Sequence, residues 1–163
     1  MENEKVETLK LLEGYIDDYL PDLKYYSDTL SSKYSNVNDY FEVATKAIKE
    51  MQRQVGTPVF DENGMIQKGI MIRHLILPNH LQNTKHILKW VKENMPKGTY
   101  INVMAQYFPT YKAKEDKLLN RKITKREYQE IENYLYTLNL ENGYIQELGA
   151  HEEEYVPNFD LSE

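Results

Sequence analysis

The sequence predicts an α/β protein whose parallel strands form a partial (β/α) barrel. Three apolar runs, at residues 15–20, 69–77 and 100–106, end in polar residues, and a helical pattern follows each run. Alternating strands and helices are typical of parallel strands joined by right-handed crossovers. Short apolar pairs flank Asn63 and Gly64, which favours a hairpin. We therefore expect about three parallel strands with flanking helices plus a small β-hairpin.

The first part of the chain carries two helical patterns, one before and one after the first strand in the sequence. Apolar residues recur on one face over residues 3–13, and Gly14 ends this helix. Residues 21–38 are punctuated by Ser and Asn and are predicted to form a loop. A second helix is expected over about 40–54, with an apolar face formed by Phe41, Ala44, Ile48 and Met51.

The second half of the chain repeats the order of strand and helix. One helix is predicted from about residue 83 to 94. A long polar loop over 107–123 precedes another helix, which runs to about residue 138. Thr124 and Glu127 have the spacing of a capping box, in which two side chains satisfy free amides at the helix start.

The C-terminal end is predicted to be less regular. Asn142 and Gly143 indicate a turn into a short extended segment over 144–148. A length of 163 residues with 40% hydrophobic residues suits one globular domain. We therefore expect a single domain over residues 1–150, followed by a C-terminal tail over 151–163.

Composition excludes several classes of function. The net charge of −6 argues against nucleic acid as a partner, because phosphate binding needs a basic surface. Apolar runs stay well short of the roughly 20 residues of a membrane span. The N-terminus does not read as a signal peptide, so we expect a cytoplasmic protein without membrane partners. The chain has no cysteine, which excludes disulfides, thiolate metal sites and cysteine nucleophiles within it.

Asp22 and Lys24 follow the first strand and form the first candidate site. Because side chains alternate along an extended chain, both should lie on one side, with Leu23 opposite. A carboxylate and an ammonium group on one face can bind a zwitterion or an amino acid moiety. The alternative is an ordinary surface salt bridge, which contributes little to stability.

Arg73 lies inside the second apolar run and is the next candidate. A charge in a buried strand is costly unless it is paired. In a barrel Arg73 can point into the lumen and reach a ligand carboxylate or phosphate. The alternative is a buried ion pair with Asp22 or Asp18. His74 should point to the opposite side and serve a structural role.

Gln106 and Tyr107 end the third strand. A glutamine amide both donates and accepts hydrogen bonds, which suits the positioning of a polar ligand; the alternative is capping of the strand end. His80 follows the second strand, but no other histidine stands at metal-ligand spacing from it. Phosphate-loop, nucleophile-elbow and zinc-protease motifs are absent. We therefore predict neither metal ligands nor catalytic residues.

Four segments in this order resemble the C-terminal half of a radical S-adenosylmethionine protein: residues 16–25, 40–44, 73–78 and 104–107. The chain is most similar to uncharacterised bacterial homologues of pyruvate formate-lyase activating enzyme. The resemblance covers roughly residues 4–148 and implies the later strands of a partial (β/α)6 barrel.

The resemblance also implies roles for the candidate residues. Asp22 and Lys24 match an Asp-x-Lys pair that approaches S-adenosylmethionine in the family. Arg73 matches an arginine in the barrel lumen, near cofactor and substrate. The family carries a histidine near the cofactor after its sixth strand, where this chain has Gln106 and Tyr107 as substitutes.

In complete members of the family, a 4Fe–4S cluster held by three cysteines cleaves S-adenosylmethionine to a radical that abstracts hydrogen. Because this chain lacks cysteine, the resemblance implies an orienting half that is inactive alone and binds neither cofactor tightly. We expect a fragment or a truncated gene product, whose missing N-terminal half or a protein partner supplies the cluster.

Two other functions stay open. The chain can be a stand-alone half-barrel binding module that self-associates, because open sheet edges invite pairing. It can also be an unrelated barrel enzyme that uses Lys24 as a Schiff-base nucleophile.

Overall fold

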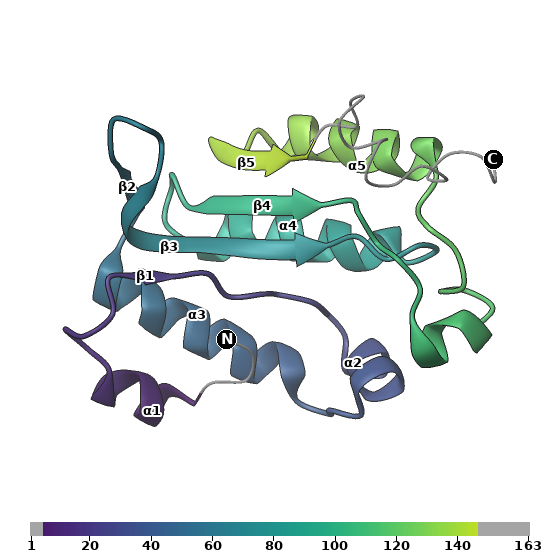
Figure 1. Ribbon diagram of the computed structural model, residues 1–163, viewed down its shortest axis with the longest axis horizontal. Helices are drawn as coiled ribbons and strands as arrows, with labels where there is room; N and C mark the ends of the chain where they lie inside the picture. The colour runs from purple at the N-terminus through teal and green to yellow at the C-terminus, as the bar shows by residue number, and fades with distance from the viewer. Residues whose placement is uncertain (1–4, 147–163) are drawn as a thin grey trace.

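A computed structural model describes residues 5–146 of the chain. The elements in order are α1 (Val6–Leu11), β1 (Asp18–Tyr19), α2 (Asp28–Ser35), α3 (Tyr40–Val55), β2 (Val59–Phe60), β3 (Ile66–Leu75), α4 (Leu81–Asn94), β4 (Tyr100–Met104), the 3₁₀ helix η1 (Tyr111–Glu115), α5 (Lys125–Leu138) and β5 (Asn142–Ile145) (Figure 1). The predicted tail over 151–163 and the end of the predicted segment 144–148 lie outside the described residues.

The sheet is mostly parallel. Strands β1, β3, β4 and β5 lie side by side in that order and are all parallel, while β2 pairs antiparallel with β3. Within residues 5–146 the sheet does not close on itself. The predicted α/β fold, with an open parallel sheet, flanking helices and a small hairpin, is therefore confirmed. The fourth parallel strand arises because the extended segment after Asn142 pairs with β4.

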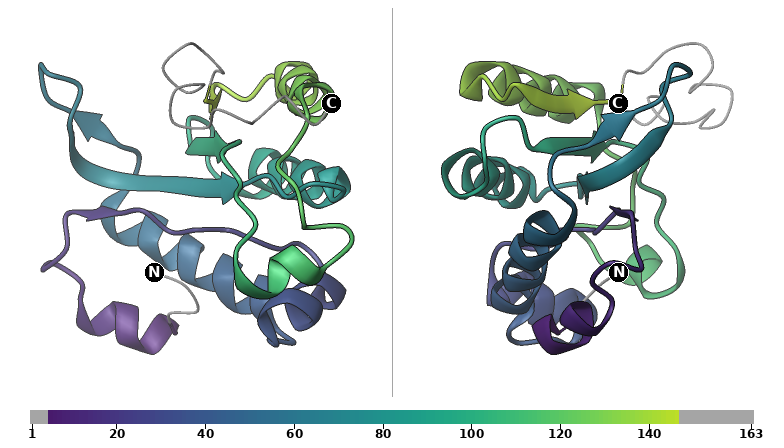
Figure 2. Two further views of the ribbon diagram at one scale, coloured as in Figure 1. Left: turned by 45° about the vertical axis from the view of Figure 1, so that its right-hand side comes forward. Right: turned by 90° about the vertical axis from the view of Figure 1, so that its left-hand side faces the viewer.

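Helices α3, α4 and α5 gather on one side of the strands (Figure 2). Side chains of β3 alternate accordingly: Ile70 and Ile72 are fully buried toward these helices, whereas Met71 and Arg73 are half-buried on the opposite face. We call this opposite face the open face. Its polar and apolar side chains on β3 and β4 are Met71, Arg73, Leu75, Tyr100, Asn102 and Met104.

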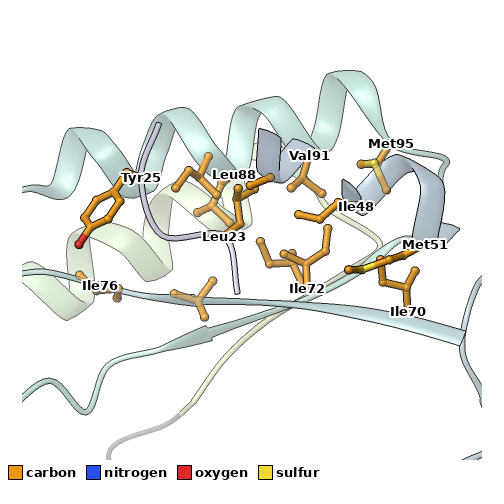
Figure 3. Packing of buried hydrophobic residues seen from close by; sticks show 14 of the residues in the cluster. Leu23, Tyr25, Ile48, Met51, Ile70, Ile72, Ile76, Leu88, Val91 and Met95 are labelled. Atoms are coloured by element: carbon orange, nitrogen blue, oxygen red, sulfur yellow. The ribbon is translucent and has the colours of Figure 1, made fainter. Parts of the chain in front are cut away.

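The core fills the space between the sheet and the helices. Apolar side chains of β3 pack against α3 and α4, and Leu23 packs with them (Figure 3). The labelled members include Ile48, Met51, Ile70, Ile72, Ile76, Leu88 and Val91. Burial of each such side chain contributes roughly 1.5–3 kcal/mol, so this layer fixes the strands that carry the candidate site.

Two predicted loops contain helices. The segment 21–38 contains α2, because the Ser27 side chain accepts a hydrogen bond from the Leu30 amide and so caps its start. Asn36 ends α2 in the left-handed conformation, with φ 55°. The predicted loop 107–123 contains η1.

The first two strands differ in length from the prediction. The first strand is short, because the ladder between β1 and β3 is interrupted and resumes only as a bridge between Asp22 and Arg73. The second strand begins earlier than predicted, at Ile66, since the second arm of the hairpin continues directly into β3. Gly69 permits this path: its φ is +126°, and a Cβ atom there would lie 2.4 Å from Cα of Pro58.

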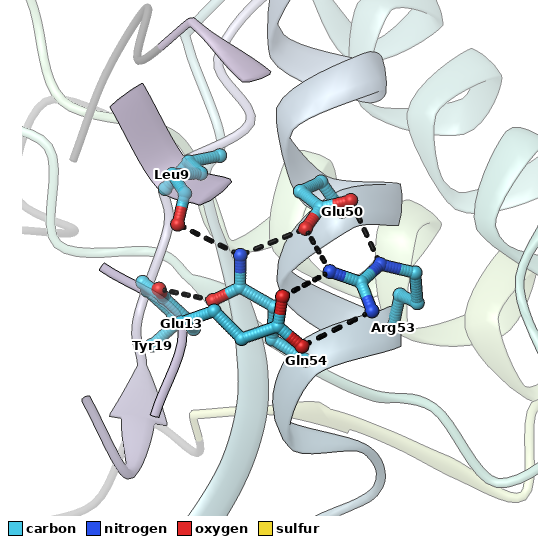
Figure 4. A network of polar contacts seen from close by, with 6 residues as sticks. All are labelled: Leu9, Glu13, Tyr19, Glu50, Arg53 and Gln54. Atoms are coloured by element: carbon cyan, nitrogen blue, oxygen red, sulfur yellow. Dashed lines mark hydrogen bonds and ion pairs between the residues drawn. The ribbon is translucent and has the colours of Figure 1, made fainter. Parts of the chain in front are cut away.

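A polar network joins α1, β1 and α3 (Figure 4). The buried Glu50 carboxylate accepts hydrogen bonds from Arg53 and Gln54, and Arg53 also binds Glu13. Gln54 further donates to the Leu9 carbonyl at 2.8 Å. The Arg53 guanidinium lowers the pKa of Glu50 to about 2. This network anchors the N-terminal helix against α3.

Candidate functional site

A row of polar side chains crosses the open face. Asp22 is bridged to Arg73, Arg73 is in register with Asn102, and Asn102 is in register with Tyr144. Neighbouring residues along the strands, such as Ile72, are buried on the helix side. The side chains of this row therefore share the open face, and we call Asp22, Arg73 and Asn102 the polar row.

Asp22 and Arg73 form an ion pair. Nε and Nη2 of Arg73 lie 2.9 and 2.8 Å from Oδ1 of Asp22. The side chains are 40% exposed for Arg73 and 24% exposed for Asp22, so the pair itself adds little stability. Within residues 5–146, Nη1 of Arg73 and Oδ2 of Asp22 make no hydrogen bond, which leaves a donor and an acceptor for a ligand. The predicted ion pair between Arg73 and Asp22 thus forms, but it is partly exposed and not buried.

The backbone of residues 22–24 is fixed by buried side chains. The Tyr40 hydroxyl donates to the Asp22 carbonyl and accepts from the Lys24 amide. Asn83 Nδ2 donates to the Lys24 carbonyl at 2.8 Å. Asp22 and Lys24 are both half-buried, whereas Leu23 is fully buried. Asp22 and Lys24 therefore lie on one side and Leu23 on the other, as predicted.

The buried His74 side chain also holds the segment of residues 22–24 in place. Its ring is 1% exposed and lies 2.7 Å from both the Leu23 carbonyl and the Thr84 hydroxyl. Burial lowers the pKa of His74 to about 4, so the ring is neutral at neutral pH. Because a carbonyl can only accept, Nδ1–H donates to Leu23 and Nε2 accepts from Thr84. The predicted structural role of His74 is confirmed.

Asn102 was not predicted from the sequence. It lies between Arg73 and Tyr144, is half-buried, and makes no side-chain hydrogen bond with any described residue. Asparagine is disfavoured in strands. An asparagine in the middle of an apolar run, on the same side as Gln106, is the signal that could have identified it.

Gln106 and Tyr107 lie in different surroundings, since Gln106 is half-buried and Tyr107 is buried. Gln106 follows β4 and is half-buried, and the Tyr107 amide donates to the Ala105 carbonyl at 3.0 Å, so the chain turns tightly at Gln106. Tyr107 is buried, and its hydroxyl donates to the Leu119 carbonyl at 2.9 Å. Burial raises the pKa of Tyr107. The structure thus pairs Asp22 with Arg73 and places Lys24 on the same side of its segment as Asp22. Gln106 lies beyond the end of β4, and Tyr107 holds the loop that contains η1.

A pocket of about 570 Å³ lies elsewhere, between the loop before α2 and the starts of α4 and α5. None of the five predicted site residues lines it. His80 does, and its ring is 2.7 Å from the Tyr34 hydroxyl. In the part of the chain that the structure describes, no three His, Cys, Asp or Glu residues are grouped to hold a metal ion. None of the helices there combines the length and apolarity of a membrane span.

No family model matches the chain, and no solved structure matches it. The chain is similar to the uncharacterized protein MJ0674 of Methanocaldococcus jannaschii, with 35% identity over 133 residues. The aligned part covers 80% of this chain and 33% of that relative. The chain therefore spans about a third of the length of the relative that it matches, and the relative's name carries no activity.

Proposed function

We propose that the chain is the cofactor- and substrate-orienting C-terminal part of a radical S-adenosylmethionine protein similar to the activating enzymes of glycyl-radical enzymes. The polar row on the open face of a partial parallel barrel carries this proposal. In parallel α/β proteins, ligands bind near the carboxyl ends of the strands. Asp22, Lys24 and Gln106 follow the strands β1 and β4 at that end.

The residues of the open face suit S-adenosylmethionine. A free Asp22 oxygen accepts hydrogen bonds from an ammonium group, and the Arg73 guanidinium donates to a carboxylate. The amides of Asn102 and Gln106 do either, which also suits ribose hydroxyls. The ion pair holds the side chains of Asp22 and Arg73 before the ligand arrives, which reduces the ordering cost of binding. When bound, S-adenosylmethionine supplies the radical chemistry of the family.

The residues present do not fit a 4Fe–4S cluster. Its usual protein ligands are cysteine thiolates, and this chain has no cysteine. In our proposal this chain therefore takes no part in cluster chemistry and is inactive alone. Tyr107 receives a structural role, because its hydroxyl is engaged with Leu119.

The relative's greater length supports the idea of a larger unit. The chain matches 33% of that protein, so two thirds of the relative is not represented by the aligned part. In our proposal a missing N-terminal half or a partner protein lies beside the open sheet and completes the site. The net charge of −6 favours neither nucleic acid nor anionic membranes as partners. We place the protein in the cytoplasm.

Equilibrium dialysis with labelled S-adenosylmethionine tests the proposal. We expect weak binding by this chain alone, with a dissociation constant of about 1 mM. Arg73→Gln should weaken it roughly ten-fold or more, since a hydrogen bond to a charged group contributes about 1.5–3 kcal/mol. Arg126→Gln, on the exposed side of α5, is the matched control.

Two outcomes would contradict the proposal. One is no binding by the unchanged chain at about 10 mM ligand. The other is equal affinity for the Arg73→Gln and Arg126→Gln variants. Circular dichroism of each variant checks that loss of binding does not come from loss of fold.

A second candidate is the self-associating half-barrel module. An aromatic strip on the sheet favours it: ring centroids of Phe60 and Tyr100 lie 5.3 Å apart, and those of Tyr100 and Tyr144 lie 6.0 Å apart. Phe60 and Tyr144 are 36% and 52% exposed, and Met65 nearby in sequence is also exposed. Large exposed apolar patches mark interaction sites. Sedimentation should show dimers, whereas a clean monomer at high concentration would refute this candidate.

A further inference from the structure

The pocket of about 570 Å³ is a separate site. It opens between the loop that precedes α2, the first turns of α4 and the first turn of α5. Its ten lining residues include none of the polar row, nor Lys24 or Gln106. The volume is in the range of pockets that hold small molecules.

The walls of this pocket are held in place by hydrogen bonds. The buried Asn83 side chain accepts from the Tyr26 amide at 2.7 Å and donates to the Lys24 carbonyl at 2.8 Å. His80 is held by the Tyr34 hydroxyl at 2.7 Å. A ligand would therefore meet a largely preformed surface, which lowers the entropic cost of binding.

A series of aromatic rings ends at the pocket. Trp90 contacts Phe41 at 5.7 Å, Phe41 contacts Tyr26 at 4.8 Å, and Tyr26 contacts His86 at 4.7 Å between centroids. The Tyr26 and His86 planes are tilted by 33° to each other. His86 is exposed and is the last ring of the series. A flat ring that packs on His86 would extend this series of ring contacts.

The pocket carries little available charge. None of its ten lining residues is Lys or Arg, which disfavours a phosphate or a carboxylate ligand. Glu127 lines it, but its two oxygens accept from Arg121, the Thr124 amide and the Asn79 amide. The geometry thus leaves neutral hydrogen-bonding groups.

Gln82 and His86 provide two neutral hydrogen-bonding groups to the pocket. Both side chains line the pocket, are exposed, and make no hydrogen bond with any residue of the described range 5–146. A glutamine amide pairs well with a ring edge that offers a donor beside an acceptor. Leu30 and Leu81 supply apolar walls.

We propose that this pocket binds a neutral, planar heteroaromatic ring of the nucleobase type, stacked on His86 with its polar edge toward Gln82. The proposal does not depend on the function of the open face, because the two sites share no residue. It assigns a second ligand, distinct in charge from the zwitterion expected there.

Nuclear magnetic resonance titration with uridine, cytidine and inosine tests the proposal. At least one nucleoside should shift the ring signals of His86 and Tyr26 saturably, with a dissociation constant of about 1 mM or less. His86→Ala should weaken binding about ten-fold, in line with the loss of base stacking, and Gln82→Ala should weaken it less. Tyr136→Ala, an exposed ring on α5 away from the pocket, should change nothing.

Several results would overturn it. No saturable shift at about 10 mM of any nucleoside would do so, as would equal binding by the His86→Ala variant. If indole bound as well as the best nucleoside, the polar edge of the base would not contribute to recognition. Uridine monophosphate that binds much better than uridine would show an anion site instead.

Discussion

Acidification should destabilise the protein through His74. The ring is buried and neutral, with a pKa lowered from 6.5 to about 4. The unfolded chain therefore binds a proton at a higher pH than the folded chain does. Stability from this residue is complete above pH 6.5 and falls as the pH drops from 6.5 toward 4.

The magnitude follows from the two pKa values. Between about pH 7.5 and about pH 5, linkage gives a loss of about 2 kcal/mol, and the loss approaches about 3 kcal/mol below pH 4. Carboxylates with lowered pKa values, such as Glu50, act mainly at lower pH, since they lose stability only below about 4.5. The range from pH 5 to 7.5 therefore isolates histidine, with a further contribution of the same sign from His80, whose pKa is lowered by burial.

Urea unfolding at the two pH values measures this loss. The His74→Gln variant removes the titrating ring, and an amide retains a donor and an acceptor for Leu23 and Thr84. The variant should be less stable at neutral pH but should lose about 2 kcal/mol less on acidification than the unchanged chain. An equal pH dependence in both proteins would refute the assignment of a buried, neutral His74.

Two further predictions concern stability. Gly69→Ala should cost more than about 2 kcal/mol, because its Cβ would collide with Pro58 at a positive φ, whereas Gly64→Ala, with open space around it, should cost about 1 kcal/mol; equal losses in urea unfolding would contradict the crowded hairpin. Glu50→Gln should cost about 1–2 kcal/mol at neutral pH because it weakens the bonds of a buried carboxylate to the half-exposed Arg53. This loss should shrink as the pH falls from 4.5 toward 2, and the half-exposed Glu13→Gln should cost less at neutral pH.

The regular elements could be predicted from the sequence because their signals are local. The helix at 40–54 is long and has a clear apolar face, and the Thr124–Glu127 capping box forms as expected. The alternation of strands and helices was enough to predict a parallel sheet. Helix α2 was missed because its eight residues carry a weak pattern, although Ser27 and Asn36 mark its ends.

The candidate site could be predicted only in part. Asp22 stands after a strand and Arg73 is a charge inside an apolar run, so both are conspicuous. Asn102 is uncharged and lies in mid-strand, and its importance depends on its register beside Arg73. The pocket depends on contacts between Tyr26, His86 and Glu127, which are far apart in sequence, so no local pattern could indicate it.

The central claim is that the open face binds S-adenosylmethionine through the polar row. The most direct measurement is a titration of ¹⁵N-arginine-labelled protein, in which the side-chain Nε–H signal of each arginine is followed. Our account predicts that the Arg73 signal shifts saturably, while the signals of Arg53 and Arg121, which pair with carboxylates away from the polar row, and of the exposed Arg126 stay unchanged. An unchanged Arg73 signal at about 10 mM ligand, or equal shifts at all four arginines, would contradict it.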